Sequence, residues 1–316
     1  MSTAAEDIAP DLPGRIGDTP LLRLDALARR AGGLPEGVTL WAKAEHRNPG
    51  GSVKDRAALA MILDGERSGA LVSGKAILDA TSGNTGIAYA MIGAARGWPV
   101  AVCLPSNAGE ARKRLLRAWG ATVLETDPLT GTDGAQQVAR AMALGEPGRW
   151  FHPNQYDNPA NWRAHAETTA PEIWRQTGGR VTHFLAGLGT TGTFVGTVRG
   201  LRHLAGASGL GVRAIAMQPD LPLHGIEGLK HLPTCRVPRI YDPTLADETV
   251  TVSTEDALAA QRALRELEGL DVGASSGANV HAALAVARSA TPGSLVVTIL
   301  CDRGDRDDEA EGKGAR

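Results

Sequence analysis

The residues with the clearest chemical potential stand in a lysine-bearing segment and three glycine-rich loops. The segment at 48–56 reads Asn-Pro-Gly-Gly-Ser-Val-Lys-Asp-Arg, and its Lys54 starts a helical pattern that runs to about Glu66. An ammonium group is disfavoured at the positive end of a helix dipole unless something offsets it. The irregular Asn-Pro-Gly-Gly-Ser run is typical of active-site loops. Lys54 is therefore a candidate reactive amine, with a solvated surface lysine as the alternative.

The second segment, Gly-Leu-Gly-Thr-Thr-Gly at 187–192, follows an expected strand and opens an expected helix. Its glycines let backbone N–H groups approach an anion, and the helix N-terminus adds a favourable dipole. A dinucleotide site would also need an acidic residue after the next strand, which ends in Met-Gln-Pro at 217–219. The hydroxyls of Thr190, Thr191 and Thr193 suit a single phosphate monoester better.

Two further glycine-rich loops also stand between an expected strand and a helix. Thr-Ser-Gly-Asn-Thr-Gly at 81–86 can hold a carboxylate on its backbone N–H groups, although an ordinary helix cap explains it equally well. Gly-Ala-Ser-Ser-Gly at 273–277 matches the nucleophile elbow of hydrolases, which requires the order serine, acid, histidine. Here His281 precedes Asp302, so the order is wrong for a hydrolase.

The elements that must position these loops alternate between short apolar strands and amphipathic helices. Expected strands are 40–43, 76–78, 100–104, 122–124, 182–185, 213–217 and 295–300, and expected helices include 54–66 and 84–96. Strands and helices in alternation predict an α/β fold with mainly parallel sheets flanked by helices. The proline- and asparagine-rich run 150–159 is expected to be a crossover between two halves.

Composition excludes several classes of function. The 316 residues are 42% hydrophobic and only 4% aromatic, with a formal net charge of −2, which favours neither nucleic acid nor a membrane surface. The three widely separated cysteines form no metal-ligand pattern and suit a reducing cytoplasm, so no metal is expected. The polar N-terminus is unlike a signal peptide. The polar tail 302–316 is expected to be disordered.

From about Ile16 to Cys301 the chain resembles the cysteine synthase family, the β-replacement branch of the fold-type II pyridoxal-phosphate enzymes. Four motifs occur in the family's order: N-P-G-G-S-V-K-D-R, T-S-G-N-T-G, G-T-T-G-T and G-A-S-S-G. Each is weak alone, and the ordered set is specific. The run Gly-Asp-Thr-Pro-Leu at 17–21 is also similar to a segment near the family's start.

The resemblance implies a role for each matching residue. Lys54 would carry pyridoxal 5'-phosphate, Asn84 would bind its ring hydroxyl oxygen, and Ser275 would face its pyridine nitrogen. The phosphate-binding residues would be Gly189, Thr190, Thr191, Gly192 and Thr193. The residues binding the substrate carboxylate would be Thr81, Ser82, Gly83, Thr85 and Gln155.

The resemblance further implies a homodimer of two-domain chains. Residues 45–152 would form a smaller, mobile substrate-binding domain, and residues 1–44 with 153–301 a larger cofactor-binding domain. The implied reaction is β-replacement on O-phosphoserine or O-acetylserine, giving L-cysteine through an aminoacrylate. The nucleophile would be sulfide or a protein thiocarboxylate. Cystathionine or diaminopropionate synthesis, and a non-catalytic regulatory binder of the same fold, are the alternatives.

The leaving group is indicated by one cation. Phosphoserine-using members of the family carry an arginine about where Lys230 stands, eleven residues before Tyr-Asp-Pro at 241–243. A cation there pairs better with a dianionic leaving group than with acetate, although lysine lacks the bidentate geometry of arginine. A surface lysine in a loop is the alternative.

Overall fold

The structure is a computed structural model that describes residues 9, 11–81 and 83–304, and these form two compact units. Unit 1 contains residues 48–160 with the described part of the N-terminal segment up to Ile16. Unit 2 contains residues 17–47 and 161–304. Within these described ranges no helix combines the length and the apolar character needed to cross a membrane.

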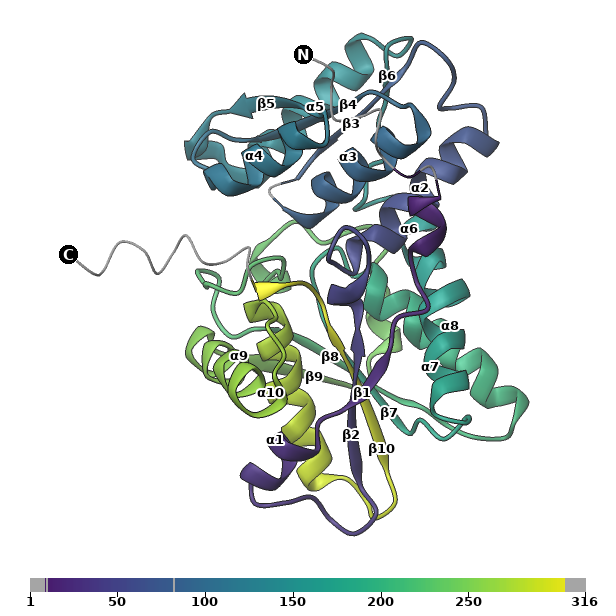
Figure 1. Cartoon of the computed structure of the whole chain (residues 1–316), viewed down its shortest axis with the longest axis vertical. Helices are drawn as coiled ribbons and strands as arrows, with labels where there is room; N and C mark the ends of the chain where they lie inside the picture. Colours follow the sequence, from purple (N-terminus) through teal and green to yellow (C-terminus); the bar gives the residue numbers. More distant parts are fainter. Residues whose placement is uncertain (1–8, 10, 82, 305–316) are drawn as a thin grey trace, which may run out of the picture. The chain divides into compact units, whose positions relative to one another are not determined.

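Unit 1 is a parallel four-stranded sheet in the order β5-β4-β3-β6, with helices on both faces (Figure 1). Its strands are β3 (Ala76–Ala80), β4 (Val100–Pro105), β5 (Thr122–Thr126) and β6 (Trp150–Phe151). Its helices are α2 (Lys54–Arg67), α3 (Asn84–Arg96), α4 (Glu110–Ala118) and α5 (Gly131–Gly145), with short 3-10 turns at Leu12–Arg15 and Pro128–Thr130. Every loop that follows a strand therefore leaves from the same edge of the sheet.

Alternation along the strands of unit 1 builds two separate apolar layers. Ile77 and Val102 point into the layer shared with α2 and α3. Leu78 and Ala101 point to the opposite face, where they pack against Ala135 of α5. Successive strand residues face opposite sides of a sheet, so a strand covered on both faces must be apolar throughout, as β3 and β4 nearly are.

Unit 2 is a six-stranded sheet in the order β1-β2-β10-β7-β8-β9, parallel except for β1. Its strands are β1 (Leu21–Arg23), β2 (Thr39–Ala44), β7 (His183–Gly187), β8 (Arg213–Pro219), β9 (Glu248–Val252) and β10 (Leu295–Leu300). The helices α1 (Asp25–Arg30), α9 (Thr254–Glu268) and α10 (Ala274–Ser289) pack together on one face. The chain also forms α6 (Pro159–Ala164), a π-helical turn at His165–Thr169, α7 (Ala170–Gln176) and α8 (Gly192–Ala207). Figure 1 shows α7 and α8 across the sheet from α9 and α10.

The predicted α/β fold with flanked parallel sheets is confirmed, and the helix predicted at 84–96 is α3 residue for residue. The crossover expected at 150–159 was predicted to begin too early, because Trp150–Phe151 form strand β6, which pairs with β3. Strands β1 and β9 were not predicted. Both lie at edges of the sheet in unit 2, where each pairs with a single neighbour. β1 has only three residues, and the alternation of Thr and Val in β9, which buries Val252, was a signal that sequence reasoning missed.

Most of the tail expected to be disordered, 305–316, lies outside the described residues. In its described part, Arg303 pairs with Val272 in an isolated antiparallel bridge, and its Nε donates to the carbonyl of His46 at 3.3 Å. His46 is buried, and burial, together with Arg47 and Arg303 nearby, lowers its pKa from 6.5 to about 4. The folded protein therefore keeps this imidazole neutral.

The pKa of His46 predicts that the free energy of unfolding falls as the pH falls from about 6.5 to about 4. In that pH range His46 binds a proton in the unfolded chain and stays neutral in the folded chain, so lowering the pH favours unfolding. Between pH 7.5 and pH 5, wild type should lose roughly 1 kcal/mol more stability than the variant His46→Gln, since residual solvent screening around this imidazole reduces the effect. Urea unfolding at the two pH values measures this, and equal losses in both proteins would contradict the buried neutral state.

Candidate active site

Lys54 is the first residue of α2, and the backbone leading to it is fixed by buried polar groups. The N–H of Gly50 donates to Asp55 Oδ2 at 2.6 Å, and the N–H of Lys54 donates to Ser52 Oγ at 3.2 Å. A Cβ at Gly50 would meet Asp55 Oδ1 at 2.5 Å, so a side chain there would push the turn off this carboxylate. The loop predicted to be irregular therefore holds the backbone of Lys54 in a defined place.

The loop that follows β3 meets the segment that follows β6. Thr85 Oγ1, in the first turn of α3, donates to Gln155 Oε1 at 2.8 Å, and Gln155 Nε2 lies 3.5 Å from the carbonyl of Ala80. Thr81 Oγ1 accepts from the N–H of Gly83 at 3.2 Å. Thr81, Thr85 and Gln155 are all buried. The structure thus brings together several of the residues predicted to bind a carboxylate.

Sequence reasoning missed a buried carboxylate at the base of this loop, Asp79. Its Oδ1 accepts from the N–H of Ala80 at 2.8 Å and lies 3.4 Å from His152 Nε2, and its Oδ2 accepts from the Tyr89 hydroxyl at 3.0 Å. Ala80 and His152 lead directly into the two segments that carry the predicted carboxylate site. Asp79 therefore ties these segments together, and a lone acid inside an apolar strand is the signal that could have found it.

The Tyr89 hydroxyl is a permanent donor in this network. Its side chain is completely buried, and burial raises the pKa of Tyr89 well above its ordinary value, with the negative charge of Asp79 adding to the effect. Because the phenol stays protonated, it always donates to the carboxylate.

The predicted phosphate loop of unit 2 joins the carboxyl end of β7 to the start of α8. Two of its glycines leave no room for a side chain. A Cβ at Gly189 would meet the carbonyl oxygen of Gly228 at 2.2 Å, and a Cβ at Gly192 would meet Asn161 Oδ1 at 2.0 Å. These two close contacts therefore fix the backbone of the turn, as an anion-binding turn requires.

The threonines of this loop differ in their hydrogen bonds. Thr190 Oγ1 accepts from Asn161 Nδ2 at 3.2 Å, and Thr193 Oγ1 lies 3.3 Å from His165 Nε2. Thr191 has a φ of 70°, which is rare for a β-branched residue. Its Oγ1 is buried and has no hydrogen-bond partner among the described residues. Backbone strain together with an unsatisfied hydroxyl is a combination often found at ligand-binding sites.

Ser275 is the second residue of α10 and is buried. Its hydroxyl donates to Asp302 Oδ1 over 3.5 Å, a long hydrogen bond. The N–H of Gly273, just before the helix, donates to the carbonyl of Asp302 at 3.1 Å. Asp302 was not predicted to lie beside this serine, because the two are far apart in the sequence and meet only when β10 lies alongside α10.

Lys230 is half-buried, and its backbone lies against the phosphate loop. Its N–H donates at 2.8 Å to the carbonyl of Leu188, the residue before Gly189. Gly228, two residues earlier, has a φ of 81° and supplies the carbonyl that packs on Gly189. The segment that carries this lysine is therefore part of the same local structure as the loop.

The predicted site residues divide between the two units. Unit 1 carries Lys54, Thr81, Gly83, Asn84, Thr85 and Gln155. Unit 2 carries Gly189, Thr190, Thr191, Gly192, Thr193, Lys230 and Ser275. Ser82 lies outside the described residues. In the part of the chain that the structure describes, no three His, Cys, Asp or Glu side chains are grouped to hold a metal ion.

Comparisons with known proteins agree on one enzyme family over most of the chain. Residues 12–302 match the family described as pyridoxal-phosphate dependent enzyme. A cysteine synthase of Aquifex aeolicus is 46% identical over 92% of this chain and 88% of its own length. An O-ureido-L-serine synthase of Streptomyces lavendulae is 38% identical over 92% of this chain and 88% of its own length. The crystal structure of a cysteine synthase from Entamoeba histolytica matches with a TM-score of 0.89 and 31% identity, covering all of this chain and 94% of that one.

The residues of the loop fit the phosphate of this cofactor. The buried hydroxyl of Thr191 needs an acceptor that the described protein does not give it, and a phosphate oxygen would be one. The loop also stands at the N-terminus of α8, whose dipole favours an anion. The start of this helix carries hydroxyl donors, and two glycines let the backbone N–H groups come close to a ligand. Both features suit a phosphate monoester.

Replacing Gly189 by alanine should weaken the binding of pyridoxal phosphate. The new Cβ would meet the Gly228 carbonyl at 2.2 Å, so one of the two backbones must move. We expect affinity to fall roughly tenfold or more. Gly206→Ala is the matched control, because that glycine is in α8 and a Cβ there would meet nothing within 4 Å.

Cofactor affinity is measured by titrating the apo-proteins with pyridoxal phosphate, after their unfolding temperatures show that both variants fold. Wild-type affinity in folded Gly189→Ala would show that the loop does not hold the phosphate.

Proposed function

Because the chain belongs to the pyridoxal-phosphate-dependent enzyme family, we propose that it replaces the β-substituent of an activated serine with sulfide, giving L-cysteine. The observation that carries this proposal is the 46% identity to a cysteine synthase over 92% of the chain. A relative named O-ureido-L-serine synthase is 38% identical, so the family likeness alone does not fix the nucleophile. Sulfide is the nucleophile that agrees with the cysteine synthases among the relatives.

The proposed cofactor site uses this chain's residues in separate roles. Lys54 would hold the cofactor covalently, Asn84 would bind its ring hydroxyl oxygen, and the 189–193 loop would bind its phosphate. Ser275 would face the pyridine nitrogen, and its hydroxyl is already oriented toward Asp302. When bound, pyridoxal phosphate supplies an electron sink for the carbon next to the substrate's amine.

The remaining residues would bind the substrate and move its proton. Thr81, Ser82, Gly83, Thr85 and Gln155 would hold the substrate carboxylate through hydroxyl, amide and backbone donors. The amine of Lys54 would also act as the base that removes the Cα proton of the substrate. The Asp79 network supports this step indirectly, because it fixes the two segments that must hold the carboxylate still.

Four broader properties also belong to the proposal. The smaller domain, 45–152, would bind substrate and move, and the larger domain, 1–44 with 153–301, would bind the cofactor. The enzyme would act as a homodimer in the cytoplasm. Its sulfur donor would be sulfide, with a protein thiocarboxylate as the other source of the same nucleophilic sulfur.

Lys230 supports a donor with an anionic leaving group. Its backbone is fixed against the phosphate loop by the hydrogen bond to Leu188, so its side chain starts from a defined point close to the proposed cofactor phosphate. An ammonium group stabilises a departing phosphate more strongly than a departing acetate, since phosphate carries more negative charge. We therefore propose O-phosphoserine as the preferred donor.

Cysteine formation from sulfide and either O-phosphoserine or O-acetylserine tests the function and the donor together. Wild type should form cysteine with a higher kcat/KM for O-phosphoserine. Lys230→Met should lower that value roughly tenfold or more and change the value for O-acetylserine by no more than about twofold. Arg239→Met, which removes an exposed cation later in the same long loop, is the control.

The two parts of the proposal fail in different ways. Preference for O-acetylserine with no effect of Lys230→Met would reject the role of this lysine and leave the reaction intact. Absence of cysteine from both donors, in protein that contains pyridoxal phosphate, would reject the reaction.

A further inference from the structure

A cavity lies at the opposite end of the sheet in unit 1 from the predicted carboxylate loop. Its volume is about 710 Å³, within the range of small-molecule sites. The lining includes Ala76, Val100, Thr122 and Trp150, the first residues of β3, β4, β5 and β6. Because these strands are parallel, the loop at 81–86 leaves from their other ends. The cavity is therefore separate from the predicted substrate site.

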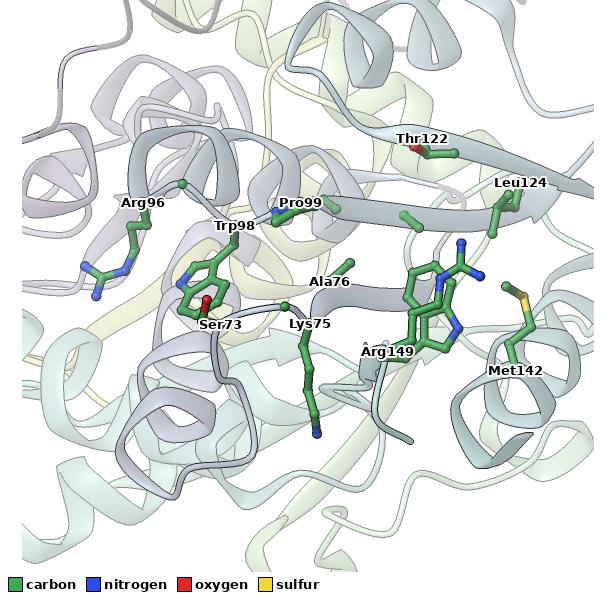
Figure 2. Close-up of a pocket in the computed structure, with 15 residues that line it drawn as sticks. Ser73, Lys75, Ala76, Arg96, Trp98, Pro99, Thr122, Leu124, Met142 and Arg149 are labelled. Atoms are coloured by element: carbon green, nitrogen blue, oxygen red, sulfur yellow. The ribbon is translucent and has the colours of Figure 1, made fainter. Parts of the chain in front are cut away.

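The walls of the cavity are apolar and aromatic. Ala76, Ala101, Leu124 and Met142 contribute aliphatic surface, and Trp98 contributes an indole (Figure 2). Three of the fifteen lining residues are basic, Lys75, Arg96 and Arg149, and none of those described there is acidic. Apolar walls that carry basic side chains can bind an organic anion, provided that one of the cations is only weakly paired with the protein's own carboxylates.

One of the three cations is held by the protein itself. Arg96 donates to both carboxylate oxygens of Glu66, at 3.0 and 2.6 Å, and Trp98 Nε1 donates to the same carboxylate at 2.6 Å. These hydrogen bonds, that of Arg96 foremost, hold the pKa of Glu66 below its usual range. Figure 2 shows Arg96 at one end of the cavity, beside Trp98. Its charge is already balanced, so it is not the group that would bind an anion.

Arg149 is differently placed. Figure 2 shows its guanidinium group beside Leu124, on the side of the cavity where Met142 lies. It stacks over the ring of Trp150 at 4.5 Å, which fixes the plane of the guanidinium. Its ion pair with Glu146 uses Nη1 at 3.1 Å, and both side chains are more than half exposed. Exposed ion pairs contribute little free energy, so a ligand can compete for this guanidinium.

We propose that this cavity is a second binding site, which takes a small carboxylate with a flat or branched apolar body. Arg149 binds the carboxylate, and the surface between Trp98 and Met142 binds the apolar body.

The test uses the holoenzyme, phenylacetate as the probe, and the indole N–H resonances of Trp98 and Trp150 as reporters. Phenylacetate should shift both resonances and saturate, whereas phenethylamine, with the same ring and the opposite charge, should not. Arg149→Met keeps the apolar stem and removes the charge, and should weaken phenylacetate binding roughly tenfold or more. Arg140→Met is the control, since that arginine is exposed on α5 and does not line the cavity.

Each outcome decides the proposal. The variant Thr85→Val alters the predicted substrate site and shows whether the probe binds there. Loss of affinity for phenylacetate in Arg149→Met, with wild-type affinity in Arg140→Met and in Thr85→Val, supports the second site. Binding that survives Arg149→Met, or that is lost in Thr85→Val, places the probe elsewhere and overturns it. Equal binding of phenylacetate and phenethylamine overturns the assignment of a carboxylate ligand.

Discussion

The close approach of two backbones, at Gly189 and at the carbonyl of Gly228, is the constraint on which the chemistry of unit 2 depends. This contact fixes the turn that follows β7. The turn holds Thr191 at a positive φ, and the hydroxyl of Thr191 is buried and unsatisfied. The hydrogen bond from the Lys230 N–H to the carbonyl of Leu188 fixes the segment that carries this lysine. Two adjacent backbone contacts thus position both the proposed phosphate site and the cation proposed to select the leaving group.

In unit 1 a buried carboxylate has the corresponding role. Asp79 binds groups from β3, α3 and the segment after β6, so three parts of the chain share one polar centre. Burying a carboxylate is costly unless its oxygens are satisfied, and here donors reach both of them. Rigid support of this kind is what holding a substrate carboxylate demands, because catalysis is sensitive to small errors of position.

Local pattern was sufficient to predict the α/β class, most strands and the helix at 84–96, because these depend on apolar spacing within a few residues. The motifs, taken in order, led to the cysteine synthase family, and the family and its cofactor are confirmed by the comparisons. The roles of individual site residues stay predictions. Short edge strands such as β1, and the contacts of Asp79 and Asp302, depend on partners distant in sequence.

The measurement that tests the central claim most directly is chemical reduction of the holoenzyme with borohydride, followed by digestion and peptide mass mapping. Reduction makes the link between a lysine and pyridoxal phosphate permanent, so the modified peptide identifies the lysine. The proposed site predicts the added mass on the peptide that contains Lys54 and on no other lysine. Modification at Lys43, Lys113 or Lys230 instead, or no modification in protein shown to contain the cofactor, would contradict it.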